Sequence, residues 1–573
     1  MSKLTQNALP ELSDKHGFMA SAPTLNVLDE ELKLVRQTRV RIIMGMLVFG
    51  LFFMILVSRL AEISLLRAPK AVSGMTVNTV KSRADIVDRN GELLATSLMT
   101  YSLGADPRKV WDPVASTEAI ISALPGLDPA VVEGRLSSNK SFIWLRRNLT
   151  PKQRHAVFSL GLPELEFRVE PKRVYPRGRL ASHILGFTDI DQNGTAGVER
   201  VFDEQLFKEN APAKRLSLDM GVQFSVEDEL RAGMKKFQAD AASGIVMNIK
   251  TGEILAMASM PDFNPNRFGD TLPQNRLNRA SMSLYELGST FKPITMALAH
   301  ETGVMRDEEK LDVQDKLVIQ SKSITDDHPS PVALGAYDIL AQSSNRGVAL
   351  LALRSGAEAQ QDLLRRLGLF SRVPIELHES AAPLVAEEWQ DITTATVAYG
   401  HGISVTPLAL ASALATLLNG GVYVEPTIEK HRLGKAVRSQ RAVSVQTSKH
   451  IIRMMRYVVT DGTGRNAAVK GYEVMGKTGT AEKLINGKYV KNRLVTSFVA
   501  AFPYSDPQYL VFIVYDEPKA YAGSSGYATA GWNAALTARA VTERIAPLLG
   551  VKKIVETSAL HKGLNGTVNG GMQ

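Results

Sequence analysis

The sequence predicts an α+β domain with a mainly antiparallel sheet flanked by helices, preceded by a region of short strands and one N-terminal membrane helix. An uncharged apolar run near the start predicts the membrane helix. Two hairpin patterns, one near residue 90 and one over residues 243–259, predict strands in separate regions. Helical periodicity at residues 280–420 is followed by strand patterns at 472–517, which predicts one sheet assembled from both ends of the last domain.

Composition places the chain among globular proteins of two to four domains. Its 573 residues are 45% hydrophobic and 22% charged and include no cysteine, which excludes a disordered or disulfide-stapled chain. The 67 Lys and Arg against 58 Asp and Glu give a net charge of +9. No dense basic block accompanies this mild excess, so we expect no nucleic-acid partner. A chain without thiols suits an oxidising compartment such as the periplasm.

The apolar run near the start is typical of a signal anchor. Ile42 to Val57 gives 16 residues without charge, about 24 Å as a helix, and apolar residues continue to Leu66. No small-x-small cleavage site follows the run, which disfavours a cleaved signal peptide. We expect a cytoplasmic tail at 1–35 and an uncleaved anchor at 36–66. Basic residues slightly favour the N-terminus in the cytoplasm.

Two domains and a tail are expected after the anchor. Residues 67–235 alternate short apolar runs with turn residues, and Asn90-Gly91 between two such runs predicts a hairpin. A second hairpin at 243–259 opens the domain expected at 236–552. Helices are expected there over 290–301, 406–418 and 532–549, with strands over 471–480, 495–502 and 509–515. The Gly- and Asn-rich end, 553–573, is expected to be disordered.

Three short motifs that can build a nucleophilic site follow one another in the last domain. They are Ser289-x-x-Lys292, Ser343-x-Asn345 and the run Lys477, Thr478, Gly479 and Thr480. Ser289 opens an apolar helix, and its spacing to Lys292 puts both side chains on one helix face. Two further matches, at 137–140 and at 250–252, lie in a polar run and at an expected hairpin tip. We therefore assign the site to Ser289.

These residue types suit acyl transfer through a serine. A serine hydroxyl becomes a good nucleophile when a base takes its proton. Lys292 can be that base if burial and a neighbouring cation lower its pKa, and Lys477 would be the cation. Ser343 could relay a proton, and Asn345 could hold a substrate amide.

The third motif can supply substrate binding. A strand that carries residues 478–480 can pair with an extended peptide. The N–H groups of Thr480 and Ser289 could form an oxyanion hole.

The ordered trio resembles that of the penicillin-recognising serine transferases. The rest resembles the class B penicillin-binding proteins over roughly residues 40–545. The matching segments include RADIVDRNG (83–91), RVYPRGRLASHILGF (173–187), GTAGVER (194–200), LSLDMGVQ (216–223), YELGSTFKP (285–293), AYGHGISVTPLALA (398–411) and GTGRNA (462–467). Leu287 is a departure, because the family usually has proline there.

The resemblance implies a penicillin-binding transpeptidase fold preceded by an elongated, mostly-β pedestal (67–235). It makes Ser289 the acylated nucleophile and Lys292 the general base. Ser343 and Asn345 would form the second motif, and residues 477–480 the third. The family has a stretch like Asp326-Asp327-His328 near its site, but we interpret this polar run as a solvated loop.

The implied function is that of a peptidoglycan D,D-transpeptidase. It would cross-link stem peptides that end in D-Ala-D-Ala, and β-lactams would acylate it. The chain would be a single-pass protein of the bacterial inner membrane with its catalytic domain in the periplasm. The run Tyr399-Gly400-His401-Gly402 resembles the division-specific, septal branch. The resemblance thus implies a membrane-embedded septal glycan polymerase and other divisome proteins as partners.

Alternatives are an elongation-specific transpeptidase, a β-lactamase, a β-lactam-sensing receptor and a non-catalytic divisome scaffold. The elongation enzyme would share every catalytic residue. The length and anchor disfavour a β-lactamase, the lack of H-E-x-x-H disfavours the receptor, and the intact trio disfavours the scaffold. The ten histidines show no metal-ligand spacing, and no cofactor motif occurs, so we expect neither metal nor cofactor.

Overall fold

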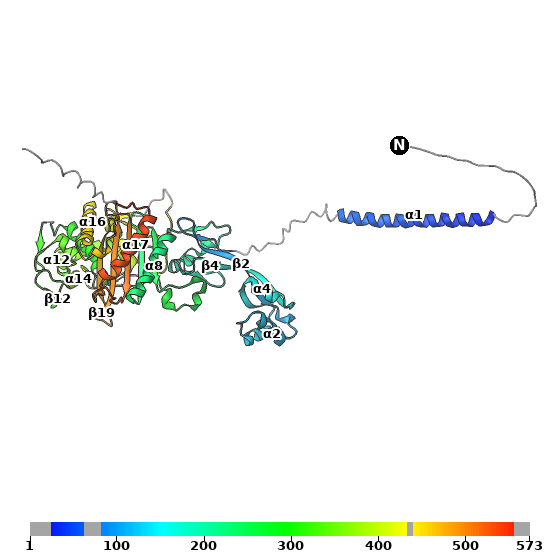
Figure 1. Cartoon of the computed structure of the whole chain (residues 1–573), viewed down its shortest axis with the longest axis horizontal. Helices are drawn as coiled ribbons and strands as arrows, with labels where there is room; N and C mark the ends of the chain where they lie inside the picture. The colour runs from blue at the N-terminus through cyan, green and yellow to red at the C-terminus, as the bar shows by residue number, and fades with distance from the viewer. Residues whose placement is uncertain (1–24, 62–81, 307, 432–438, 555–573) are drawn as a thin grey trace, which may run out of the picture. The chain divides into compact units, whose positions relative to one another are not determined.

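The computed structural model describes residues 25–61, 82–306, 308–431 and 439–554 and contains two compact units, 1–79 and 80–573 (Figure 1). In the first unit, helix α1 (Leu25–Ala61) includes a segment, Arg39–Leu60, that is long and apolar enough to cross a membrane. The helix begins ahead of the anchor expected at 36–66. Most of the tail expected at 553–573 lies outside the described residues.

A five-stranded sheet organises residues 86–215. Four strands follow the order β3-β2-β1-β7, and β4 pairs with β2. Val87 pairs with Leu93 across the Asn90-Gly91 turn, so the expected hairpin is confirmed. The strands are β1 (Ile86–Val87), β2 (Leu93–Ala105), β3 (Ile143–Leu149), β4 (Leu165–Val174) and β7 (Lys214–Arg215).

Short helices and one small strand pair complete this region. Helices α2, α3 and α4 each begin with a capping side chain followed by proline, as at Asp112, whose carboxylate accepts the N–H of Val114 (3.0 Å). Their apolar faces form a core with β2 and β3. The elements are α2 (Pro113–Ala123), α3 (Pro129–Leu136), α4 (Pro151–Phe158), α5 (Ser182–Leu185), α6 (Gly197–Val201), α7 (Asp203–Leu206), β5 (Phe187–Thr188) and β6 (Gly194–Ala196).

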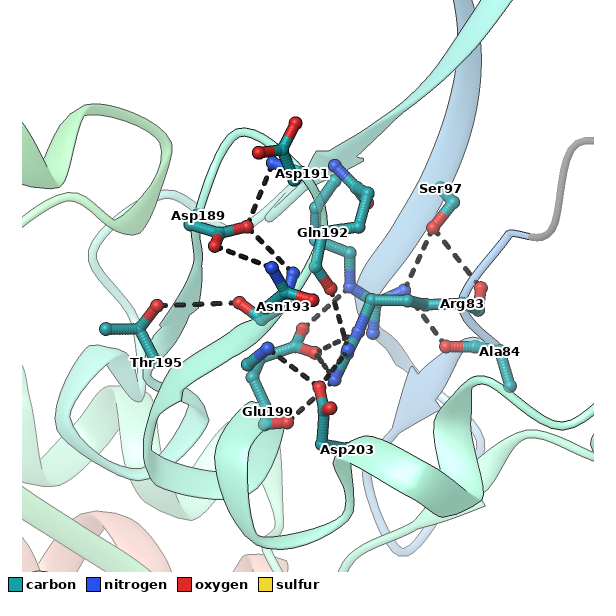
Figure 2. Close-up of polar contacts among 12 residues, drawn as sticks. Arg83, Ala84, Ser97, Asp189, Asp191, Gln192, Asn193, Thr195, Glu199 and Asp203 are labelled. Carbon is teal, nitrogen blue, oxygen red and sulfur yellow. Dashed lines mark hydrogen bonds and ion pairs between the residues drawn. The ribbon is translucent and has the colours of Figure 1, made fainter.

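Charged residues from distant segments meet in the interior of this region (Figure 2). Arg83 Nε donates to Glu199 Oε2 (2.9 Å), and Arg173 Nε donates to Glu199 Oε1 (2.7 Å). These three side chains are at most 1% exposed. Arg83 also pairs with Asp203 and donates to the carbonyl oxygen of Gln192 (2.9 Å). Two buried guanidinium groups are thus balanced by two carboxylates.

A second five-stranded antiparallel sheet has the order β18-β19-β20-β8-β9. β8 (Ala241–Asn248) and β9 (Ile254–Met260) form the second expected hairpin. β18 (Met475–Ile485), β19 (Lys488–Phe502) and β20 (Tyr509–Asp516) come from the end of the chain. β20 pairs with β8, so the prediction that one sheet is assembled from both ends is confirmed.

Helices cover both faces of this sheet. α8 (Met220–Phe237) and α17 (Ala534–Leu548) pack together on one face, and their apolar residues share a core with that face (Figure 1). On the other face lies a larger core that includes α10 (Lys292–Thr302), α12 (Asn345–Ser355), α15 (Pro407–Leu418) and α16 (Val445–Thr460). The layers are therefore helix, sheet and helix, as expected for an α+β domain.

α15 shows how sequence builds this inner layer. Thr406 Oγ1 accepts the N–H of Ala409 (3.1 Å), and Pro407 occupies the first helical position, so the helix begins at a defined residue. Every residue of α15 is buried, which agrees with apolar side chains on all its faces.

Short elements link these layers. They are α9 (Arg279–Met282), β10 (Lys310–Leu311), β11 (Leu317–Ile319), β12 (Lys322–Ile324), β13 (Leu334–Gly335), α11 (Ala336–Ala341), α13 (Ala357–Arg366), β14 (Leu384–Val385), α14 (Asp391–Val397), β15 (Ile403–Ser404), β16 (Val422–Val424) and β17 (Ser439–Arg441). The 3-10 turns are η2 (Pro107–Lys109), η3 (Pro265–Asp270), η4 (Pro273–Arg276), η5 (Gly288–Phe291), η6 (Arg465–Ala467) and η7 (Ala530–Trp532).

Replacing Glu199 by Gln should strongly destabilise residues 82–215. The change leaves two buried guanidinium groups against the single carboxylate of Asp203, and breaking a buried pair costs about 3–5 kcal/mol. Thermal unfolding of the full chain in detergent measures the loss as a lower Tm. Asp191→Asn is the control, since that carboxylate is 66% exposed in its pair with Arg147 and should matter little. Equal Tm values for the two variants would contradict the expectation.

Candidate active site

Ser289 and Lys292 lie where a 3-10 turn passes into a helix. Ser289 belongs to η5 and is half-buried, while Lys292 begins α10 and is fully buried. Gly288 takes a left-handed conformation (φ +58°), and a Cβ there would meet the Thr480 carbonyl oxygen at 2.7 Å. The absence of a side chain at 288 therefore lets the nucleophile segment approach β18.

The Lys292 amine reaches the second motif. Its Nζ donates to Asn345 Oδ1 (2.8 Å), to Ser343 Oγ (3.1 Å) and to the Ser343 carbonyl oxygen. Ser343 has φ +63°, which turns the chain sharply just before α12 begins at Asn345. The expected first and second motifs are thus brought into direct contact.

The third motif contacts the same Ser343 hydroxyl. Lys477 Nζ donates to Ser343 Oγ (2.9 Å) and to the Thr478 carbonyl oxygen (3.0 Å). Both amines therefore share one hydroxyl group. Lys477 is fully buried, and β18 holds it in the expected strand.

Burial sets the electrostatics of the two amines. It lowers the pKa of Lys292 to about 7, against the opposing effect of Asp326 and Asp327. It also lowers the pKa of Lys477 well below its usual value, and the nearby charge of Lys292 acts in the same direction. Because two ammonium groups beside one hydroxyl repel each other without water to screen them, each amine releases its proton more readily than a lysine in water does.

A cleft of about 420 Å³ opens beside Ser289. Among its lining residues are Ser343, Thr463, Asn466, Thr478 and Thr480. Thr463 Oγ1 hydrogen-bonds Thr478 Oγ1 (2.9 Å), and Thr480 Oγ1 accepts the N–H of Ala530 (3.1 Å). β18 lies at the edge of its sheet, which leaves its outer side open to an extended peptide. A serine, two amines and an open strand edge suit acyl transfer to and from a peptide.

Comparisons with known families agree with this geometry. Residues 242–536 match the penicillin binding protein transpeptidase domain, and residues 78–215 match the penicillin-binding protein dimerisation domain. The chain belongs to the class B penicillin-binding proteins. The resemblance seen in the sequence is thereby confirmed.

Individual relatives cover most of this penicillin-binding protein. A probable peptidoglycan D,D-transpeptidase FtsI of Caulobacter vibrioides is 40% identical over 91% of this chain and 90% of that protein. Peptidoglycan D,D-transpeptidase FtsI of Escherichia coli is 31% identical over 77% of this chain and 80% of that protein. Penicillin binding protein 3 of Mycobacterium tuberculosis, solved with aztreonam, superposes with a TM-score of 0.65 at 25% identity, covering 82% of this chain and 97% of that chain.

The two further motif matches, at 137–140 and at 250–252, lie away from this cleft. Ser137 is exposed at the C-terminal end of α3, with no helix beginning at it. Lys250 lies in the β8–β9 turn, where its Nζ pairs with Asp506 (2.7 Å). Neither match therefore contributes to the cluster of side chains around Ser343.

The structure corrects one interpretation beside the site. Asp326, which we interpreted as part of a solvated loop, is buried and hydrogen-bonded to Ser344 Oγ (2.8 Å). It also pairs with Arg346 (3.2 Å), and both side chains are 4% exposed. The local run Thr-Asp-Asp-His has no apolar periodicity that could reveal this burial. The one signal in the sequence was the resemblance of this run to a stretch that the family has near its site.

Replacing Gly479 by Ala should slow acylation by penicillin by about 100-fold. A Cβ at 479 would lie 2.5 Å from the Leu287 carbonyl oxygen and 2.5 Å from Ser497 Oγ, which forces β18 away from Ser289. A misplacement of about 1 Å is enough for a loss of this size. The second-order acylation rate with a fluorescent penicillin measures it. Gly269→Ala is the control, because nothing lies within 4 Å of a Cβ there. An unchanged rate in Gly479→Ala would refute the argument.

Proposed function

We propose that this protein is the septal peptidoglycan D,D-transpeptidase of its cell, acting through a Ser289 acyl-enzyme. The observation that carries the proposal is the Ser343 hydroxyl shared by the amines of Lys292 and Lys477. The FtsI relatives from two bacteria support the division role over the elongation role.

The first half-reaction forms an ester. Ser289 Oγ attacks the carbonyl carbon of the penultimate D-Ala, and Lys292 accepts the hydroxyl proton. The N–H groups of Ser289 and Thr480 stabilise the oxyanion of the tetrahedral intermediate. Its collapse breaks the C–N bond, and the terminal D-Ala leaves as an amine after it receives a proton through Ser343.

The substrate itself decides which lysine holds the remaining proton. In the free site, Asp326 and Asp327 favour the charged form of Lys292. The terminal carboxylate of the substrate, bound near Lys477, Thr478 and Thr480, favours the charged form of Lys477 instead. Binding therefore leaves Lys292 neutral, as its role as general base requires.

The second half-reaction transfers the acyl group. The side-chain amine of a neighbouring stem peptide attacks the ester carbon and forms an amide bond, the C–O bond to Ser289 breaks, and the proton lost by the amine passes to the Ser289 oxygen. Asn345 holds the donor peptide amide, and the open edge of β18 around Gly479 pairs with its backbone. A β-lactam enters the first half-reaction through its ring amide, and its acyl group stays on the serine.

The rest of the chain places this site in the cell. We propose an uncleaved anchor in the inner membrane, with the N-terminus in the cytoplasm and both later domains in the periplasm. The proposed pedestal binds a septal glycan polymerase and other divisome proteins. We propose that the pedestal, expected to end at 235, gives way to the transpeptidase domain before residue 220, a boundary supported by the packing of α8 on the transpeptidase sheet.

Replacing Ser289 by Ala should abolish covalent labelling by penicillin while the chain stays folded. Ser289 does not cap a helix with its side chain, so its loss should cost little stability. Incubation with a labelled penicillin and peptide mass mapping measure the result. Ser137→Ala is the matched control and should label like the wild type. Labelling of Ser289→Ala at the wild-type rate would refute the assignment.

Acylation should accelerate as the pH rises through about 7. The base must be neutral, and burial lowers the pKa of Lys292 to about 7, so its neutral fraction grows over this range. Lys292→Arg should not acylate at any pH from 6 to 10, because a guanidinium with a pKa above about 12 cannot accept the proton. Lys477→Arg should retain measurable acylation, because it keeps the positive charge. Equal second-order rates for the two variants would show that the roles are shared or reversed.

A further inference from the structure

The carboxylate of Asp326 accepts hydrogen bonds from residues 344–346, which include Asn345 of the second motif. Its Oδ1 accepts the N–H groups of Asn345 and Arg346, the latter at 3.1 Å. Its Oδ2 accepts from Ser344 Oγ (2.8 Å) and Arg346 Nε (3.2 Å). Four hydrogen bonds from three consecutive residues thus converge on one buried carboxylate.

The neighbouring backbone of Thr325 fixes the same motif from its side. Asn345 Nδ2 donates to the Thr325 carbonyl oxygen (3.0 Å), which orients the amide so that Oδ1 faces the Lys292 amine (2.8 Å). Segment 325–326 therefore holds both the backbone and the side chain of Asn345.

These contacts of segment 325–326 constrain the strained turn at Ser343. A non-glycine residue with φ +63° is costly, and such a conformation persists only where its surroundings enforce it. The hydroxyl that the two lysines share lies on this turn. The contacts of Asp326 to residues 344–346 fix the chain immediately after it.

We propose that Asp326 is a positioning residue of the transpeptidase: its carboxylate fixes Ser343 and Asn345 against the Lys292 amine. The proposal rests on the proposed acyl-enzyme function and adds a residue to it. Arg346 is its charged partner, and this guanidinium is held in turn by the carbonyl oxygens of Gln314 (2.7 Å) and Asp315 (2.9 Å).

A second consequence is electrostatic. Four charged or titratable groups act on Lys292 or feel its charge: Asp326, Asp327, Lys477 and His401. Both carboxylates raise the pKa of Lys292, and the charge of Lys292 in turn lowers the pKa of Lys477. Burial keeps the His401 imidazole neutral, with a pKa of about 4. Removal of the Asp326 charge should therefore move the pH midpoint of acylation downward.

The test measures the second-order acylation rate of Ser289 by a fluorescent penicillin from pH 5 to 10, with the full chain in detergent. Asp326→Asn should lower the alkaline plateau at least tenfold and shift the midpoint to lower pH. A folded Asp326→Asn enzyme whose plateau stays within twofold of the wild type would overturn the proposal.

Asp327→Asn is the matched control. It removes the same charge from the next residue along the chain, whose side chain is exposed. It should shift the midpoint in the same direction and keep the plateau within twofold. A plateau loss equal to that of Asp326→Asn would assign the effect to charge alone and overturn the positioning role.

Asp326→Asn leaves the Arg346 guanidinium buried without its carboxylate, so a second variant is needed. Asp326→Asn combined with Arg346→Gln removes both charges. A plateau that stays tenfold low supports positioning, whereas recovery to the wild-type plateau would mean that Asp326 only neutralises Arg346. Failure of both variants to fold, seen as a lost thermal transition, would also overturn the proposal. A wild-type enzyme that is not labelled at Ser289 would instead refute the proposed function.

Discussion

The site depends on one constraint: two buried lysine amines donate hydrogen bonds to the same Ser343 hydroxyl. Neither amine can keep its charge at ordinary cost, because burial disfavours the ammonium form and each charge disfavours the other. This tension is what makes an amine available as a base near neutral pH. The surrounding fold maintains it. α10 presents Lys292, β18 presents Lys477, and the turn before α12 presents the hydroxyl between them.

The sequence predicted the parts whose signal is local. The two hairpins, the helices expected over 290–301, 406–418 and 532–549 and the late strands are confirmed, because each has its own periodicity and turn residues. Residues of the three motifs also lie together in the structure, whereas Ser137 and Lys250 lie elsewhere, and the catalytic roles of the motif residues stay a prediction. Asp326 was misinterpreted because its burial comes from residues 344–346, whose pairing with 326 no local pattern records. The start of α1 at Leu25 was missed, since that polar stretch lacks periodicity.

A buried charge network gives a physical role to the pedestal segments that carry the family resemblance. Arg83, Arg173 and Glu199 come from three of those segments, and they meet as one buried network. Figure 2 shows Arg83 and Glu199 within it. A buried ion pair need not add net stability, because desolvation of each charge offsets the attraction. It does destabilise every arrangement of the chain in which one of these charged side chains is buried without its partners. The network thus favours the one arrangement in which the three segments meet.

The strand order β18-β19-β20-β8-β9 also constrains how the protein can be made. β8 is complete by residue 248, yet its partner β20 begins only at Tyr509. Until those later residues have been synthesised, the hairpin of β8 and β9 has an unsatisfied edge. Such distant pairing gives a high contact order and slow folding. The nascent chain must therefore be kept from aggregation until β20 has been made. The active-site strand β18 can join the sheet only through β19 and β20, so catalytic competence arrives last.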